Sequence, residues 1–148
     1  MALLERNAEQ QMKSLRHLVA MDLPATQKLR LHIKGILSAF YKSPYLNRLI
    51  HHMIEYANST WGSRRVVEIY VEPMIKAYRE IVAQGVKEGT FRAVDPALLY
   101  YSLVGSCDYL FSGANMLPKI LNAPKINEEI KRLYSEHIID MVLNGLSI

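Results

Sequence analysis

The sequence has little cysteine and no long uninterrupted apolar run. Its one cysteine, Cys107, excludes an intramolecular disulfide and lies among apolar residues, so we expect an inert buried thiol. The longest apolar stretch, residues 98–111, contains Ser102, Ser106 and Asp108 and is too short for a bilayer, which requires about 20 apolar residues. The first residues show no cationic segment followed by an apolar one. We therefore expect no signal peptide and a cytoplasmic location.

Several chemical motifs are also missing. The sequence has no carboxylate pair in an acid–base arrangement, no glycine loop suited to a phosphate, and no cysteine and histidine spacing suited to a metal. His51 and His52 point to different faces of a helix, so they cannot chelate one ion, and we expect Glu55 to contact His51 weakly. We predict no enzyme, no catalytic residue, no cofactor and no metal site.

The composition favours a folded domain. Half of the 148 residues are hydrophobic and 22% are charged, which supports one core and argues against global disorder. We expect a single domain over residues 1–148. The net charge of +4 is uneven, because residues 1–65 carry 10 Lys and Arg against 4 Asp and Glu, while residues 66–148 carry 8 against 10. The basic half could face an anionic partner or could be a solvated surface.

Apolar residues recur at helical spacing, and no segment alternates as a strand would. The sequence therefore predicts an all-α bundle of six helices. The expected helices run from Leu3 to Ala20, from after Pro24 to Tyr41, from Pro44 to Ala57, from Ser63 to Glu88, from Pro96 to Ser112, and from after Asn127 to before Gly145. The joint from Gly113 to Lys125 has room for a short helical turn. Pro73 should kink the fourth helix, because it removes an i→i−4 hydrogen bond.

The joint between the fourth and fifth helices carries the most specific pattern, QGVKEGTFRAVDP at residues 84–96. Gly89 provides the left-handed residue that ends a helix. Phe91 is apolar within a polar turn and should tuck under the corner. Asp95 can accept hydrogen bonds from the next helix, and Pro96 suits its first position.

The last two helices are apolar on more than one side, which a six-helix domain can hardly cover. We therefore expect a second copy to pair with them, with Gly105 and its neighbouring serines allowing close approach. The alternative is a helix that is central within one domain. The predicted dimer interface comprises Leu98, Ser102, Gly105, Ser106, Tyr109, Tyr134, His137, Ile138 and Met141.

The QGVKEGTFRAVDP joint in an all-helical chain of this size resembles the ligand-binding half of tetracycline-repressor-type (TetR family) transcriptional regulators. The ending IIDMVLNGL resembles the family's final helix, and the opening ALLERNAEQQ, within residues 1–20, resembles the helix that leads out of the DNA-reading domain. The resemblance implies an effector-sensing domain of a repressor. It further implies a homodimer whose last two helices form a four-helix bundle, with a small-molecule effector and no membrane partner.

The family carries a helix-turn-helix domain before this region, and no segment here has that pattern. We therefore expect no specific DNA binding by this chain alone, with operator DNA a partner of an intact regulator. A headless subunit that pairs with an intact relative is one alternative function. A helical-bundle enzyme acting on a small apolar substrate is another.

Aromatic and methionine side chains are expected on inward faces, where they could line a cavity for a small, largely apolar or aromatic molecule. The candidate ligand-binding residues are Phe40, Met53, Tyr56, Trp61, Tyr70, Met74, Tyr78, Tyr101 and Asp108. Ordinary core packing is the alternative for each of them. Asp108 could pair with a cationic ligand, or it could accept hydrogen bonds from Tyr101, Tyr109 or a partner chain.

Overall fold

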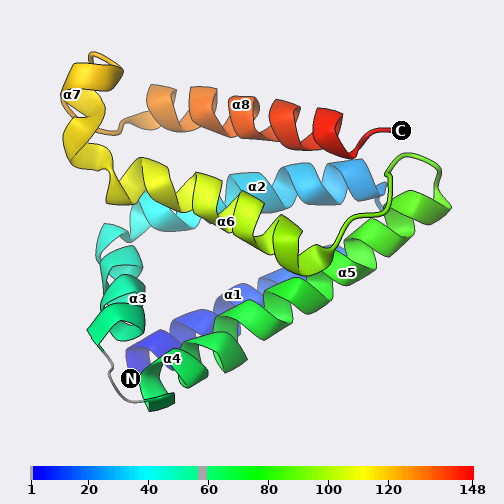
Figure 1. The fold of residues 1–148 in the computed structure, drawn as a ribbon, viewed down its shortest axis with the longest axis horizontal. Helices are drawn as coiled ribbons and strands as arrows, with labels where there is room; N and C mark the ends of the chain where they lie inside the picture. Colours follow the sequence, from blue (N-terminus) through cyan, green and yellow to red (C-terminus); the bar gives the residue numbers. More distant parts are fainter. Residues whose placement is uncertain (1, 57–59) are drawn as a thin grey trace.

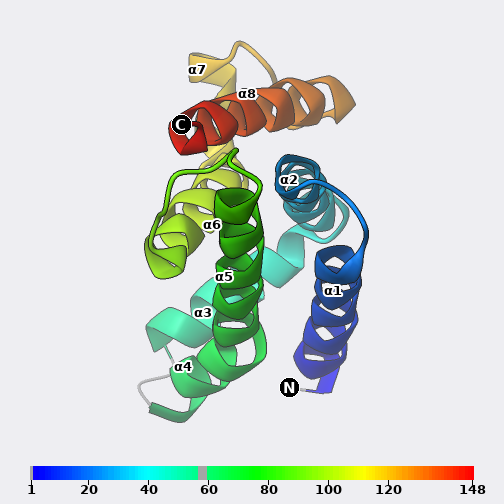
Figure 2. The same ribbon diagram turned by 90° about the vertical axis from the view of Figure 1, so that its right-hand side faces the viewer.

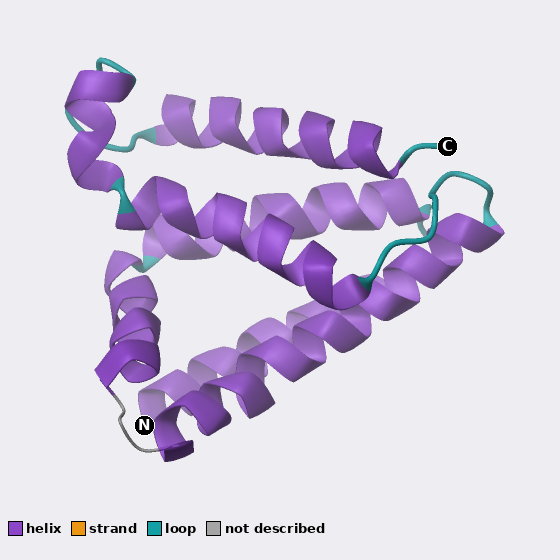
Figure 3. Ribbon diagram, in the orientation of Figure 1, coloured by secondary structure: helices purple, strands orange, loops and turns teal. Residues whose placement is uncertain are grey.

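The structure, a computed structural model, describes residues 2–56 and 60–148, and at residues 56 and 60–62 it describes the backbone alone. Helices form most of this part of the chain (Figure 3). In chain order they are α1 (Ala2–Ala20), α2 (Ala25–Lys42), α3 (Pro44–Tyr56), α4 (Thr60–Val66), the π-helix η1 (Val67–Val71), α5 (Glu72–Lys87), α6 (Pro96–Ser112), the 3₁₀-helix η2 (Ala114–Met116), α7 (Leu117–Ile120) and α8 (Glu128–Leu146). The described residues contain no β-strand, which confirms the all-α prediction.

The helix bounds follow local capping chemistry. The side chain of Asp95 accepts a hydrogen bond from the N–H of Ala97 (2.8 Å), and that of Asn127 accepts one from the N–H of Ile130 (2.9 Å). Each bond satisfies one of the orphan donors at a helix start. α8 continues past Gly145, where the sequence predicts its end, and η2 and α7 provide the helical turns expected in the preceding joint.

The expected fourth helix is divided into α4, η1 and α5. In η1 the N–H of Glu72 donates to the carbonyl of Val67, which is one residue further back than in an α-helix. Pro73 follows directly and has no N–H to donate. The sequence predicts a kink at Pro73, and the structure has a π-helical turn immediately before it, a feature that often occurs at functional sites.

The buried side chains form two clusters. Figures 1 and 2 show the helices that contribute to them. In Figure 1, α4, η1 and α5 form one long diagonal, α1 runs behind it, and α2, α6 and α8 lie across the upper half. The upper cluster joins α2, α5, α6 and α8 and includes Leu29, Ile33, Tyr78, Leu103, Cys107 and Ile139. The lower cluster joins α1, α3, α4, η1 and α5 and includes Leu4, Met12, Leu15, Leu46, Val66 and Tyr70.

A polar network holds the α1–α2 corner against the end of α5. The ammonium of Lys28, a residue only 5% exposed, donates to the carbonyl of Val19 (2.6 Å) and to the Oε1 of Gln84 (2.8 Å). The Oε2 of Glu88 accepts from the N–H of Ala25 (3.1 Å), so the residue that follows α5 caps the start of α2. A hydrogen bond from the Gln84 amide, and then the one from Ala25, lower the pKa of the Glu88 carboxyl. In the part of the chain that the structure describes, no helix is long and apolar enough to cross a membrane.

Candidate functional site

The corner between α5 and α6 has the geometry that its sequence predicts. Gly89 has a φ of +77°, and the N–H groups of Thr90 and Phe91 both donate to the carbonyl of Gly85 (2.9 and 3.1 Å). The Phe91 ring is 2% exposed and packs where a Cβ on Gly85 would stand. Gly85 is therefore needed for close approach, whereas Gly89 is needed for its backbone conformation.

The same corner holds the end of α8. The N–H of Arg92 donates to the carbonyl of Leu146 (2.8 Å), and its Nε donates to the carbonyl of Gly145 (2.7 Å). Phe91 and Ser147 form an isolated antiparallel bridge. The positions of α6 and α8 are therefore linked through one short turn.

Asp108 on α6 pairs with His51 on α3. The Nε2 of His51 lies 2.9 and 3.0 Å from the two carboxylate oxygens, and the side chains are 44% and 18% exposed for His51 and Asp108, respectively. The expected partners of Asp108, Tyr101 and Tyr109, are not the ones it contacts. The role of His51 was not evident from its sequence neighbours, since a contact with Glu55 was the expectation and its actual partner lies 57 residues away.

The inner face of α6 around this pair is desolvated. Burial raises the pKa of Cys107 to about 12, with the nearby Asp108 carboxylate adding to the shift. Burial also raises the pKa values of Tyr100 on α6 and of Tyr78 on α5, which packs against it. These groups therefore stay neutral at physiological pH, and the buried thiol is not a reactive thiolate.

The structure divides the predicted ligand-binding residues between the two clusters. Tyr70 is buried in the lower cluster, and Met53 and Met74 pack against it. Tyr78 is fully buried in the upper cluster, where Phe40 packs and contacts the ring of Phe111 at 5.7 Å between centroids. The side chains of two further candidates, Tyr56 and Trp61, lie outside the described residues.

Tyr101 does not lie on an inward face. Its side chain is 73% exposed, on the same side of α6 as Leu98 (66%) and Tyr109 (63%). The prediction was wrong because α6 is apolar around most of its circumference, so its periodicity does not distinguish the inner face from the outer one.

The outer faces of α6 and α8 expose most of the predicted interface. Ser102, Gly105 and His137 are exposed, and Met141 is 58% exposed. The hydroxyl of Tyr134 donates to the carbonyl of Ser106 (2.5 Å) at the contact between the two helices, and both residues are partly buried. Ile138 differs from the prediction: it is 5% exposed and belongs to the upper cluster, because it faces inward from α8.

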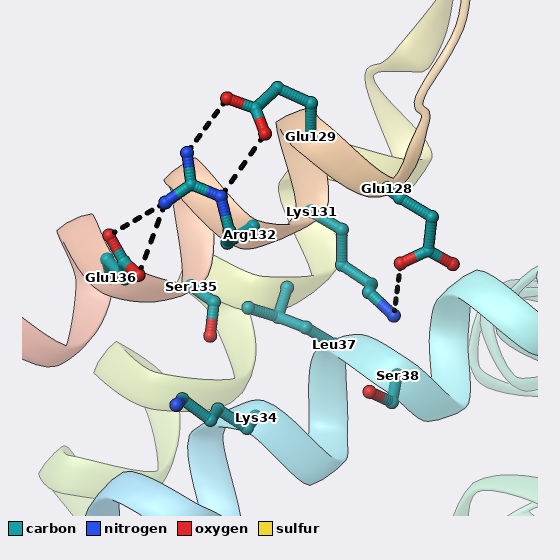
Figure 4. Close-up of a pocket in the computed structure, with 9 residues that line it drawn as sticks. All are labelled: Lys34, Leu37, Ser38, Glu128, Glu129, Lys131, Arg132, Ser135 and Glu136. Atoms are coloured by element: carbon teal, nitrogen blue, oxygen red, sulfur yellow. Dashed lines mark hydrogen bonds and ion pairs between the residues drawn. The ribbon is translucent and has the colours of Figure 1, made fainter.

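Open pockets also occur outside these sites. One, of about 700 Å³, lies between α1 and the η1–α5 segment and is lined by residues including Met12, Leu15, Glu72 and Pro73. The other, of about 420 Å³, lies between α2 and α8, and we call it the α2–α8 pocket (Figure 4). It is lined by Lys34, Leu37, Ser38, Glu128, Glu129, Lys131, Arg132, Ser135 and Glu136. Within the described ranges, no group of three or more His, Cys, Asp or Glu side chains could hold a metal ion.

The chain matches a known protein family. The sequence profile of the family described as "Tetracyclin repressor-like, C-terminal domain" matches residues 22–148, which include every helix from α2 to α8. No curated protein sequence matches the chain.

Proposed function

The chain belongs to the tetracycline repressor-like C-terminal domain family, and on that premise we propose that it is the effector-sensing and dimerisation domain of a transcriptional repressor. Domains of this family are regulatory and serve in ligand binding and dimerisation. The observation that carries the proposal is the exposed apolar face of α6 and α8. Leu98, Tyr101, Tyr109, Leu133 and Met141 are each more than half exposed there.

A second copy of the chain is the occupant that suits this face. Apolar patches of this kind on a folded domain mark association sites, since covering them removes apolar area from water. Gly105 lies in the middle of the α6 stripe, and beyond the adjoining backbone of α6 a Cβ at this position would meet no atom within 4 Å. The small residues Gly105 and Ser102 leave room for the backbone of a partner helix to approach α6.

Light scattering on the purified chain tests the pairing. We expect a mass of about twice the 17.0 kDa of one chain at micromolar concentration. Gly105→Arg should give a folded monomer, because the new side chain fits the protomer but blocks a partner. Gly35→Arg is the matched control, since Gly35 is also an exposed helical glycine with nothing within 4 Å. A monomeric wild-type chain would contradict the proposal.

We further propose that the effector, a small and largely apolar or aromatic molecule, binds between α3, α5 and α6. Three features support this location. The partly buried Met53 and Met74 belong to the edge of the lower cluster, and Tyr100 belongs to the edge of the upper one. Methionine adapts to varied ligand shapes, and tyrosine offers a polar end. The Asp108–His51 pair adds one charged contact that could orient a cation.

A charged and a neutral probe of similar shape test the role of Asp108. We expect benzyltrimethylammonium to bind the wild-type chain and to lose about tenfold or more in affinity with Asp108→Asn, while neopentylbenzene binds both proteins alike. Asp140→Asn, an exposed carboxylate on α8, controls for the change in net charge. Equal losses for both probes, or a lower melting temperature of Asp108→Asn, would favour a structural role for the pair.

The lower cluster offers a route from such a site to α1. The Tyr70 hydroxyl in η1 donates to the Oδ1 of Asn7 (3.2 Å), and the Arg65 guanidinium pairs with Glu5 (2.8 Å). A ligand that favours one arrangement of the η1 turn would therefore also favour one position of α1. Such a shift requires different affinities of the ligand for the two arrangements.

A further inference from the structure

The α2–α8 pocket contains a buried hydroxyl that has no partner. Ser135 on α8 is 6% exposed, and its Oγ makes no hydrogen bond. Most buried polar side-chain atoms are paired, and leaving one unpaired is unfavourable. In Figure 4 the Ser135 hydroxyl points from α8 toward α2, beside the Leu37 side chain and on the side of Lys34. A ligand in this pocket would satisfy a group that the fold itself leaves unsatisfied.

The other unpaired groups of the pocket are also hydrogen-bond donors. Lys34 and Ser38 stand one turn apart on α2, on the opposite side of the same space (Figure 4). Neither side chain has a hydrogen bond or ion pair to any residue in the described ranges. One ammonium and two hydroxyls that line this pocket therefore have no partner among the described residues.

Each carboxylate in the lining pairs with a cation of its own helix. Arg132 pairs with both Glu129 (2.8 Å) and Glu136 (3.3 Å), and Lys131 pairs with Glu128 (3.1 Å) while its ammonium lies 4.8 Å from the centre of the Tyr41 ring. The charges of these residues are balanced by ion pairs within α8, and the Lys131 ammonium also contacts an aromatic ring of α2. The Lys34 ammonium can only donate, and the Ser38 and Ser135 hydroxyls can each donate, so a ligand with acceptor oxygens suits all three groups.

We propose that the α2–α8 pocket binds a small molecule through a carboxylate. The carboxylate would accept from the Ser135 and Ser38 hydroxyls and lie beside the Lys34 ammonium, in charge-assisted hydrogen bonds. The volume of the pocket, about 420 Å³, is larger than a bare ion needs and admits a small organic acid. Three glutamates border the site, so a monoanion is favoured over a doubly charged phosphate group. The site is separate from the effector site proposed between α3, α5 and α6.

Titration of the labelled full chain with benzoate, followed by amide chemical shifts in NMR spectra, tests the proposal. We expect saturable shifts at residues 34–38 and 128–136, and weaker binding of inorganic phosphate. Ser135→Ala and Lys34→Gln should each weaken benzoate binding by about tenfold. Ser135→Ala should fold normally, because it removes an unpaired hydroxyl. Lys13→Gln, on α1, makes the same charge change as Lys34→Gln away from the pocket and should bind as the wild type does.

Each alternative outcome would overturn the carboxylate site. Absence of saturable benzoate shifts at these residues would show that the pocket binds no carboxylate. Equal weakening by Lys13→Gln and Lys34→Gln would show general ionic attraction to the chain. Tighter binding of phosphate than of benzoate would replace the carboxylate with a phosphate ligand. Unchanged affinity in Ser135→Ala would remove the buried hydroxyl from the site.

Discussion

At the scale of single residues, the α5–α6 corner depends on a glycine that the turn itself does not require. Gly85 lies within α5, where alanine would ordinarily be the better helix former. The Phe91 ring occupies the space that a methyl group would need. Packing therefore reverses the usual preference at this position.

Gly85→Ala should lower the free energy of unfolding by about 1–3 kcal/mol, because the ring or the helix must move. Urea unfolding followed by circular dichroism measures the change. Gly35→Ala is the control and should raise stability by about 0.5–1 kcal/mol, since this exposed helical glycine has nothing within 4 Å. Equal stability of Gly85→Ala and the wild type would contradict the packing of Phe91.

His32 should make the fold sensitive to acid. Its Nε2 lies 2.6 Å from the buried Tyr78 hydroxyl, and burial lowers the pKa of His32 from 6.5 to about 4. The unfolded chain therefore binds more protons than the folded chain between these values. The stability from neutral His32 is present above pH 6.5 and is lost as the pH falls toward 4, by about 3 kcal/mol.

Urea unfolding at neutral pH and at about pH 4 measures this loss. The double variant His32→Leu/Tyr78→Phe removes both polar groups together, so neither is left unpaired in the core. It should show a pH dependence weaker than that of the wild type by the amount that His32 contributes. An unchanged pH dependence in this variant would place the acid sensitivity elsewhere.

At the scale of elements, the α1–α2 corner is fixed by one buried ammonium. Lys28 donates to the Val19 carbonyl, among the last four carbonyls of α1, and to Gln84 of α5. Lys28→Met keeps the hydrocarbon stem but leaves both acceptors without this donor. We expect a loss of about 1–3 kcal/mol in unfolding free energy.

Lys34→Met is the comparison for Lys28, because Lys34 lies on the same helix but is exposed and has no ion pair with any described residue. Thermal unfolding of the two variants should show a clear loss for the first and little change for the second. If both variants unfold like the wild type, the corner is held by its apolar contacts instead.

Elements whose signals are local could be predicted from the sequence, and those whose signals are distant could not. Asp95 and Asn127 cap helix starts through hydrogen bonds that span no more than three residues. The predicted bounds of α6 and α8 are therefore close to those in the structure. The His51–Asp108 pair joins residues far apart in the chain, and no spacing rule connects them. The π-helical turn before Pro73 was also missed, because a proline in a helical pattern indicates a disruption but not its form.

The same limit applies to the ligand-binding residues. Tyrosine and methionine stripes predicted inward faces, and Tyr70 and Tyr78 are buried. Their division into two clusters depends on how α1 and α2 cross α5. A helical wheel describes one helix at a time and gives no information on such crossings. The prediction that Tyr101 faces inward was wrong because α6 has no polar face that would mark its outer side.

At the scale of the whole molecule, the exposed apolar face couples stability to concentration. If a second copy covers α6 and α8, the dimer is favoured over unfolded chains by mass action. A hundredfold rise in protein concentration should then add about 2.7 kcal/mol per mole of dimer. The midpoint of thermal unfolding, Tm, should rise with concentration in calorimetry.

Gly105→Arg should abolish this dependence and Gly35→Arg should keep it, because only Gly105 lies on the exposed stripe of α6. If the Tm of the wild type does not depend on concentration, the folded chain is a monomer with this face exposed, and the dimerisation proposal is wrong.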